Sequence, residues 1–443
     1  MPNRVELMTP YILLEQEDWF EDEIRFLRRR LEAGMQAVDV GANYGLYALT
    51  IARIVGPKGK LWAIEPASPT CGFLRESIAV NAFGNFTLLQ TALSNCKGTA
   101  RLSISANSEL NTLSGEAASA ASAPETEEVP LTTLDALASE HGWSGVDFLK
   151  LDAEGEEDRI LEGGATFLHS ANPLIMLEIK HGDRMHLHLV DRLRSYGYST
   201  YKLVPGLDLL VPFDPAAPQD PFDLNLFACK PARAALLAKA GVLVTKVEVR
   251  PPGRDVQRHY ETAHDASLRP ALRHASLLAA LEEMELRCAG EDDAYQFGTC
   301  ARIAREAGER RRALELVSMA LQRYALADPG APRGFCLPAS PAYDAIPLKE
   351  KPALWLKASL LDAAIVLGAY SNYFVQGTPE QRAALLARHE DLRATGLQQA
   401  PMERRRQLLL VFSGLGRPAG DGLLATYRPD NLNPELWGGQ PPA

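Results

Sequence analysis

Acidic residues and two glycines stand at points of the sequence where a ligand could bind. A short apolar run contains Asp39 and leads directly into Gly41 and Gly45, and Glu65 lies 20 residues beyond Gly45. A glycine turn between a strand and a helix lets bare backbone and a helix N-terminus approach a ligand. An acidic residue about 20 residues further on accepts hydrogen bonds from ribose hydroxyls. The combination predicts a nucleoside site, with a ligand-free tight turn as the alternative.

The kind of nucleoside follows from what comes after the turn. A dinucleotide site has a third glycine there, whereas this chain continues with Leu46, Tyr47 and Ala48. A diphosphate therefore fits poorly, which disfavours a nicotinamide-dependent oxidoreductase. S-adenosylmethionine, with a carboxylate and an amine but no phosphate, fits better. Asp39 could orient the loop or meet the ammonium group of that ligand, directly or through water.

A second acidic stretch surrounds Asp152 and Glu154. By strand alternation Lys150 and Asp152 share a face, and Lys150, in an otherwise apolar strand, needs a partner that Asp152 or Glu178 could supply. One interpretation is a structural ion pair. The other places Asp152 or Glu154 near a transferring methyl group, where it orients or deprotonates an acceptor hydroxyl or binds a divalent metal. His181 is a further candidate base, because a neutral imidazole accepts protons near pH 7.

The elements that must position these residues alternate between strands and helices. Strands are predicted at residues 35–40, 60–65, 86–93, 146–152, 173–179, 198–204 and 225–229, with a hairpin strand at 99–104. Helices are predicted at residues 16–31, 44–55, 68–82, 131–140, 156–168 and 183–196. Residues 105–128, rich in Ser, Ala, Asn and Glu, are expected to form a loop, either a substrate-gating lid or a tolerated insertion. The pattern predicts an α/β fold with a mostly parallel sheet.

Ligands of such sheets bind beyond the carboxyl ends of the strands. The predicted cofactor-binding residues at these ends are Asp39, Gly41, Asn43, Tyr44, Gly45, Leu46, Glu65, Pro66, Leu93, Ser94 and Asp152. The predicted catalytic residues are Lys150, Asp152, Glu154, Glu178 and His181.

The chain resembles the FkbM family of S-adenosylmethionine-dependent methyltransferases over about residues 30–230. The resemblance is carried by residues 38–47, by Ala63-Ile64-Glu65-Pro66 and by Asn81, Ala92-Leu93-Ser94 and Gly98; it continues through residues 131–135, 148–157, 160–164 and 173–179. It implies a Rossmann-like class I fold with a seven-stranded sheet. It also implies O-methylation of a sugar, glycan or secondary metabolite. Two positions depart from the family: Ala153 replaces the usual Val, and Glu156 replaces the usual Ala and could alter the acceptor side.

The second half of the chain has a different, helical pattern. Residues 1–34 are expected to be a helical extension, residues 35–235 the methyltransferase domain, and residues 255–443 a helical domain. Residues 294–329 resemble one tetratricopeptide unit, which should stack on residues 269–286 or 354–370 because a single unit cannot bury its own face. Further helices are expected at 354–370, 379–395 and 402–413, with linkers at 230–239 and 251–253 and a Gly/Pro-rich tail at 421–443.

The composition limits the partners. The net charge of −10 argues against nucleic acid and anionic membranes, and no apolar run approaches the length of a membrane span. The six scattered cysteines form no Cys-x-x-Cys pair, so a reduced, cytoplasmic protein without structural zinc is expected. The helical half could bind the acceptor, a protein partner or a second subunit, or could simply cap the catalytic domain. An inactive methyltransferase-like scaffold is the alternative to an enzyme.

Overall fold

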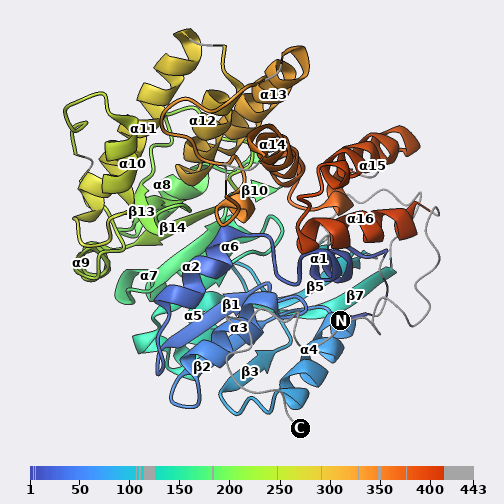
Figure 1. The fold of residues 1–443 in the computed structure, drawn as a ribbon. Coiled ribbons are helices and arrows are strands. Elements are labelled where there is room, and N and C mark those ends of the chain that lie inside the picture. Colours follow the sequence, from blue (N-terminus) through green and yellow to red (C-terminus); the bar gives the residue numbers. More distant parts are fainter. Residues whose placement is uncertain are drawn as a thin grey trace.

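The computed structural model describes residues 1–413 except 3, 5, 106, 109–110, 114–124, 182–183, 247, 291, 328, 348–350 and 376. The predicted tail at 421–443 lies outside the described residues. A sheet domain, blue to green in Figure 1, occupies one side of the molecule, and helices drawn yellow to red occupy the other. No helix of the described part has both the length and the apolar character needed to cross a membrane.

The centre of the sheet domain is, within the described residues, an eight-stranded sheet. In spatial order its strands are β3 (Phe86–Leu89), β2 (Lys60–Ile64), β1 (Gln36–Val40), β8 (Phe148–Leu151), β9 (Leu174–Glu178), β14 (Asn225–Cys229), β12 (Ser199–Val204) and β13 (Leu209–Pro212). The first five run parallel, and β14 pairs antiparallel with both β9 and β12. The predicted class I methyltransferase fold is confirmed. The resemblance implied seven strands. The structure has an eighth, β13, because the buried run Leu209–Val211 pairs with β12 at the sheet edge.

Helices cover both faces of this sheet. One face packs against α2 (Asp22–Arg30), α3 (Leu46–Val55), α4 (Ser68–Val80) and α9 (Pro231–Lys239). The other packs against α5 (Leu134–His141), α6 (Glu157–Gly163), α7 (Ala165–Ser170) and α8 (His188–Ser195). Residues 231–239 were expected to be a linker, but Ala234 of α9 is buried in the core. The expected domain boundary at residue 235 therefore falls inside a helix.

Three other predicted helices differ from the structure. The helix expected at 16–31 is present only as α2, which begins at Asp22. An earlier helix, α1 (Met8–Gln16), ends where Glu17 adopts a left-handed conformation with φ 59°. The helix expected at 156–168 breaks at Gly163-Gly164, where a Cβ on Gly163 would lie 2.3 Å from the Ser94 carbonyl oxygen. The helix expected at 183–196 begins only at His188, after the short strands β10 (Lys180–His181) and β11 (Arg184–Met185).

The expected loop at 105–128 lies partly outside the described residues and is partly a strand. β7 (Glu125–Thr132) belongs to a small second sheet with β4 (Ala92–Leu93), β5 (Gly98–Ile104) and β6 (Thr112–Leu113). The predicted strand at 99–104 is present as β5, but it pairs with β7 rather than with the strand before it. Because β7 extends to Thr132, the helix expected at 131–140 starts later, as α5.

The helical half consists of α10 (Val256–His264), α11 (Pro270–Gly290), α12 (Ala294–Glu306), α13 (Arg310–Leu326), α14 (Pro352–Gly368), α15 (Pro379–Ala394) and α16 (Ala400–Phe412). The segment that resembles a tetratricopeptide unit forms the pair α12 and α13, which packs on both α11 and α14. Their core continues into Val204, Leu209 and Val211 at the edge of the large sheet. The helical half therefore shares one hydrophobic core with that edge.

The two ends of the described chain meet, as Figure 1 shows for α1 and α16. The fully buried Glu15 on α1 accepts a hydrogen bond of 3.0 Å from the backbone N–H of Asn372, and its carboxylate lies 4.0 Å from Arg405 on α16. Beside it, Arg404 pairs with Glu17 at 2.9 Å. The last helices of the chain thus fix the first one in place.

Candidate active site

A cavity opens at the carboxyl ends of β1, β2, β4 and β8. We call it the strand-end cavity. Its lining comprises Asp39–Asn43, Leu46, Tyr47, Ile64–Pro66, Thr91–Leu93, Lys150, Asp152–Glu154 and Glu156, together with Thr9, Trp19, Glu21, Leu102, Ser108, Asn111 and Leu113. Most of the predicted cofactor-binding residues are among them. Three predicted residues are not: Tyr44 packs on the ring of Phe73, Gly45 faces α4, and the buried Ser94 donates a hydrogen bond to Glu156.

The two glycines of the turn are required by packing as well as by conformation. Gly41 has φ +77°, and a Cβ there would lie 1.6 Å from the carbonyl oxygen of Asp152. Gly45 has φ +88°, and its Cβ would lie 2.5 Å from the side chain of Leu74. Gly41 therefore lets the loops after β1 and β8 touch, and Gly45 lets α3 start against α4. The close packing of the backbone at these two glycines forms this part of the cavity wall.

Glu65 connects the loop after β2 with the loop after β1. Its buried carboxylate accepts hydrogen bonds of 2.9 Å from the backbone N–H groups of Asn43 and Ala67. Burial raises the pKa of Glu65 to about 7, and these two hydrogen bonds oppose the rise. A carboxylate has about four acceptor positions, so two of them remain for the hydroxyl groups of a ligand.

Lys150 lines the cavity and is surrounded by acidic side chains. Its Nζ is 2.6 Å from Asp152 Oδ2, 3.8 Å from Asp39 Oδ1 and 5.0 Å from the centre of the Tyr47 ring. Burial opposes its charge, but Asp152 and Asp39 outweigh that effect and raise the pKa of Lys150. Burial raises the pKa of Asp39 to about 6, against the attraction of Lys150. Of the two predicted partners of Lys150, the structure pairs it with Asp152.

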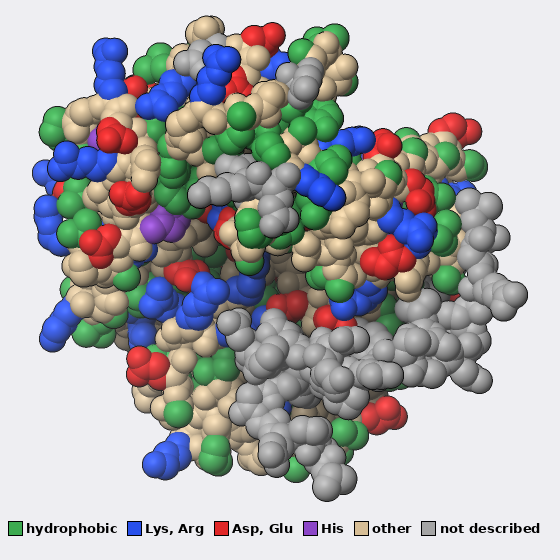
Figure 2. Space-filling model, viewed as in Figure 1, with side chains coloured by type: hydrophobic (Ala, Val, Ile, Leu, Met, Phe, Trp, Pro, Cys, Tyr) green, Lys and Arg blue, Asp and Glu red, His purple; other side chains and the backbone are tan. Residues whose placement is uncertain are grey.

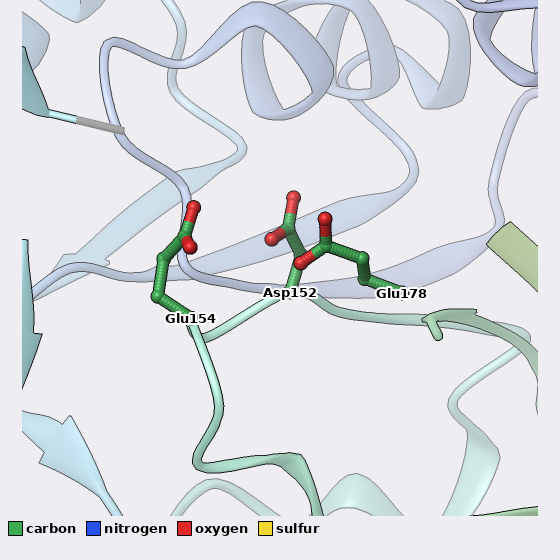
Figure 3. Close-up of side chains that lie close together, drawn as sticks. All are labelled: Asp152, Glu154 and Glu178. Atoms are coloured by element: carbon green, nitrogen blue, oxygen red, sulfur yellow. The ribbon is translucent and has the colours of Figure 1, made fainter. Parts of the chain in front are cut away.

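Glu178 meets Asp152 from β9, and Glu154 lies beside them. Oxygen atoms of the three carboxylates lie within 4.8 Å of one another, and in Figure 3 those of Asp152 and Glu178 approach each other closely. Burial and the two neighbouring carboxylates raise the pKa of Glu178 well above its ordinary value. A protonated Glu178 can donate to Asp152, so Asp152 is held between that proton and Lys150. The three carboxylates could instead hold a divalent cation if it displaced the proton.

His181 pairs with Glu154. Its Nδ1 lies 3.1 Å from Glu154 Oε2, and its ring is 6.3 Å from that of His186. Glu154 lines the cavity, whereas His181 and Glu178 are not among its lining residues. Of the predicted catalytic residues, Lys150, Asp152 and Glu154 therefore border the cavity directly, and the other two contact them.

Sequence reasoning missed several residues of this site. Glu157, buried at the start of α6, accepts hydrogen bonds from the backbone N–H groups of Ala153 and Gly155 and so fixes the loop that carries Glu154. Trp19 and Glu21 reach the cavity from the segment between α1 and α2. Glu21 accepts hydrogen bonds from Tyr47 and Trp19 and one of 3.2 Å from Asn225. Their acidic and aromatic character was visible in the sequence, but nothing local placed them at the strand ends.

The lining carries a strong excess of negative charge. The acidic side chains are Glu21, Asp39, Glu65, Asp152, Glu154 and Glu156, and Lys150 is the only cationic side chain among the described lining residues. Such a surface repels a diphosphate and attracts cationic groups. It fits S-adenosylmethionine, whose sulfonium and ammonium groups are positive. In this fit Glu65 would accept the ribose hydroxyls, and Asp39, beside the turn, would add negative charge near the ammonium group.

The comparisons with known proteins agree with this geometry. Residues 39–200 match the family model of the methyltransferase FkbM domain. No curated protein matches the chain. Among solved structures, methyltransferase FkbM from Methylobacillus flagellatus KT is 16% identical, with a TM-score of 0.32, over 48% of this chain and 48% of that chain. The match thus spans about half the length of that protein.

Two other similar structures are matched over a larger share of their own length. A SAM-dependent methyltransferase from Aquifex aeolicus is 16% identical, with a TM-score of 0.27, over 52% of this chain and 93% of that one. Fibrillarin from Aeropyrum pernix, with natively bound S-adenosyl-L-methionine, is 11% identical, with a TM-score of 0.27, over 45% and 67% of the two chains. Residues 39–200 of this chain are a methyltransferase domain of the FkbM family.

Proposed function

We propose that the protein transfers a methyl group from S-adenosylmethionine to a hydroxyl of a sugar, glycan or secondary metabolite. The observation that carries the proposal is the strand-end cavity, where six carboxylates face a single lysine and Glu65 keeps free acceptor positions. When bound, S-adenosylmethionine supplies a methyl group on a sulfonium sulfur, which keeps the electrons of the broken bond as the acceptor oxygen bonds to the carbon.

The chain contributes position and charge. Glu65 fixes the nucleoside end, and the acidic wall favours the positive end of the donor over a neutral one. Asp152, held by Lys150 at 2.6 Å, has a fixed orientation. Alignment of two bound reactants accounts for a large part of the rate of such displacements, because it replaces a bimolecular encounter.

Glu154, together with His181, is the base of the proposed reaction. Glu154 borders the cavity, and His181 Nδ1 lies 3.1 Å from Glu154 Oε2. As the carbon–oxygen bond forms, the hydroxyl proton passes to Glu154, and the imidazole can share it. Asp152 is less suited to this role because Lys150 and Glu178 already occupy its carboxylate.

Calorimetry with S-adenosylhomocysteine tests the donor assignment. We expect saturable binding that Glu65→Gln weakens roughly 10- to 100-fold, because hydrogen bonds to a charged carboxylate are lost. Glu140→Gln, an exposed position on α5, is the matched control and should leave the affinity unchanged. Binding of NAD without binding of S-adenosylhomocysteine would overturn the proposal.

The acceptor class is tested separately. An extract fed with labelled S-adenosylmethionine and the purified protein should give a labelled product whose methyl group is an ether of a hydroxyl. A label found in an ester or on nitrogen would contradict O-methylation of a hydroxyl. Donor binding with no labelled product in any extract would favour the inactive scaffold.

A further inference from the structure

A second cavity lies between the sheet domain and the helical half. It encloses about 1300 Å³ of empty space, part of it open to solvent. Its lining comes from the segment 16–25, from the end of β12, from residues 222–225 before β14 and from helices α12, α13, α14 and α16. In Figure 2 this face of the molecule is hollowed between the two halves, and basic and acidic side chains surround the hollow. We call it the interdomain cavity.

The interdomain cavity adjoins the strand-end cavity. Trp19 and Glu21 line both of them. The Glu21 carboxylate is fixed by Tyr47 on the donor side, by Trp19 and by Asn225 at the start of β14. A molecule in the interdomain cavity therefore needs to pass only this shared wall to reach the carboxylates around Asp152.

Two arginines of the helical half, Arg305 and Arg310, line the interdomain cavity and form no ion pair with any acid that the structure describes. The guanidinium of Arg305 makes no hydrogen bond or ion pair with the described residues, and burial lowers its pKa. Arg310 donates to the backbone carbonyls of Val366 and Leu367 at 2.6 and 3.1 Å, and these bonds hold it in place. Its guanidinium carbon lies 4.0 Å from the centre of the Tyr370 ring. Both can still bind an anion, Arg310 from a fixed position.

The acids of the same lining are mostly compensated. Asp18 accepts two hydrogen bonds of 2.7 Å from Arg28, and Asp223 pairs with Lys202 at 3.1 Å. Burial and the neighbouring Glu21 and Asp22 raise the pKa of Glu23 well above its ordinary value, which favours its neutral form. Apart from Glu21, which both cavities share, the charge that has no ion-pair partner among the described residues of this lining is therefore positive, in contrast to the strand-end cavity.

Aromatic rings form the rest of the wall. Trp19 and Phe20 lie 4.7 Å apart between ring centres, as do Phe20 and Tyr370, and Phe222 lies 6.0 Å from Tyr370. Rings next to planar guanidinium groups and carboxyls offer apolar faces and directed hydrogen bonds to one ligand. This combination suits a molecule with many hydroxyls, such as a sugar ring, better than a purely apolar one.

We propose that the interdomain cavity binds the methyl acceptor, and that this acceptor is a polyhydroxylated molecule with an acidic group held by Arg305 and Arg310. The inference rests on the proposed methyl transfer and names its substrate class. One hydroxyl of the bound molecule reaches past Trp19 and Glu21 to Glu154. The acidic group can be a carboxylate or a phosphate, since a guanidinium binds both in the same way.

Calorimetry of the full-length protein with saturating S-adenosylhomocysteine tests the proposal. The probes are glucuronate, glucose 6-phosphate, glucose and inorganic phosphate. We expect at least one of the two acidic sugars to bind at least tenfold more tightly than both glucose and inorganic phosphate. The tighter of the two identifies the acidic group. Arg305→Gln should weaken this binding roughly 10- to 100-fold.

Arg258→Gln, an exposed arginine on α10, is the matched control and should change neither affinity. The affinity for S-adenosylhomocysteine should stay within twofold in both variants, which also shows that they are folded. The proposal is overturned if no probe binds, if Arg305→Gln binds like the wild type, or if inorganic phosphate binds as tightly as the acidic sugar. If an acidic sugar binds through Arg305 but S-adenosylhomocysteine does not bind, the methyl-transfer proposal fails instead.

Discussion

The strand-end cavity and the interdomain cavity share a wall but differ in how they are built. The first is formed largely by residues 39–66 and 91–93 and by residues 150–156, at the ends of adjacent strands. The second brings together residues 16–25, 202–225 and 305–405. The first has a surplus of carboxylates, and the second has two guanidinium groups that form no ion pair with an acid among the described residues. Under the two proposals above, donor and acceptor are recognised by opposite charges on the two sides of Trp19 and Glu21.

The largest expected effect comes from Gly41→Ala. The new Cβ would overlap the Asp152 carbonyl at 1.6 Å, so we expect a loss of about 4 kcal/mol or more in the free energy of unfolding and no binding of S-adenosylhomocysteine. Gly142→Ala is the control: φ is +66° there too, but no atom lies within 4 Å of the added Cβ. It should cost about 1–2 kcal/mol. Urea unfolding and calorimetry measure both, and equal losses would contradict the packing role of Gly41.

Lys150→Met tests the single cation of the strand-end cavity. The buried Asp39 and the half-buried Asp152 would lose their counter-charge, and we expect the free energy of unfolding to fall by about 3 kcal/mol. Lys97→Met, an exposed position in the turn before β5, should change it by less than about 0.5 kcal/mol. Chemical denaturation at pH 7 gives both values. A similar loss for the two variants would mean that Lys150 does not compensate these acids.

Glu154→Gln separates catalysis from binding in the strand-end cavity. We expect the rate of methyl transfer to the acceptor identified from extracts to fall roughly 100-fold or more, because the base is lost. The affinities for S-adenosylhomocysteine and for the acidic sugar should stay within twofold. Single-turnover rates with labelled donor measure the effect. An unchanged rate would remove Glu154 as the base and direct attention to Asp152.

The smallest expected effect is a pH dependence of the affinity for S-adenosylhomocysteine, which concerns the strand-end cavity alone. Burial raises the pKa of Glu65 to about 7, so the carboxylate gains its proton as the pH falls from 8 to 6 and offers fewer acceptor positions to ribose hydroxyls. The affinity for S-adenosylhomocysteine should therefore fall by up to about tenfold over this range. Glu65→Gln has no such proton, and its affinity should vary less with pH. Parallel pH profiles of the wild type and the variant would assign the dependence to another group.

The sequence predicted many of the residues that line the strand-end cavity, because their signals are local. Asp39, Gly41 and Glu65 follow directly from strand ends, and sheet register then places Asp39 opposite Lys150. The class of fold followed from the alternation of strands and helices. The edge strand β13 was missed because its residues read as part of a turn between two strands.

The interdomain cavity could not be predicted in the same way. Trp19 reaches the strand ends only because α1 is fixed by helices that come more than 350 residues later, as in the contact between Glu15 and Asn372. Arg305 and Arg310 are unremarkable in a helical sequence with many arginines. Their meaning depends on which acids the fold brings near them, and no local pattern encodes that.

The contacts between α1 with Glu17 and α16 also have a consequence for synthesis of the protein. Residues 39–200 can leave the ribosome and form their sheet while Arg404 and Arg405, which pair with Glu17 and lie beside Glu15, have not yet been made. Until the last helices have emerged, Glu15 lacks its contacts with Asn372 and Arg405, whereas Glu21 can already be held by Tyr47 and Asn225. The first helix of the described chain is therefore among the first elements to be made but among the last to reach its final packing.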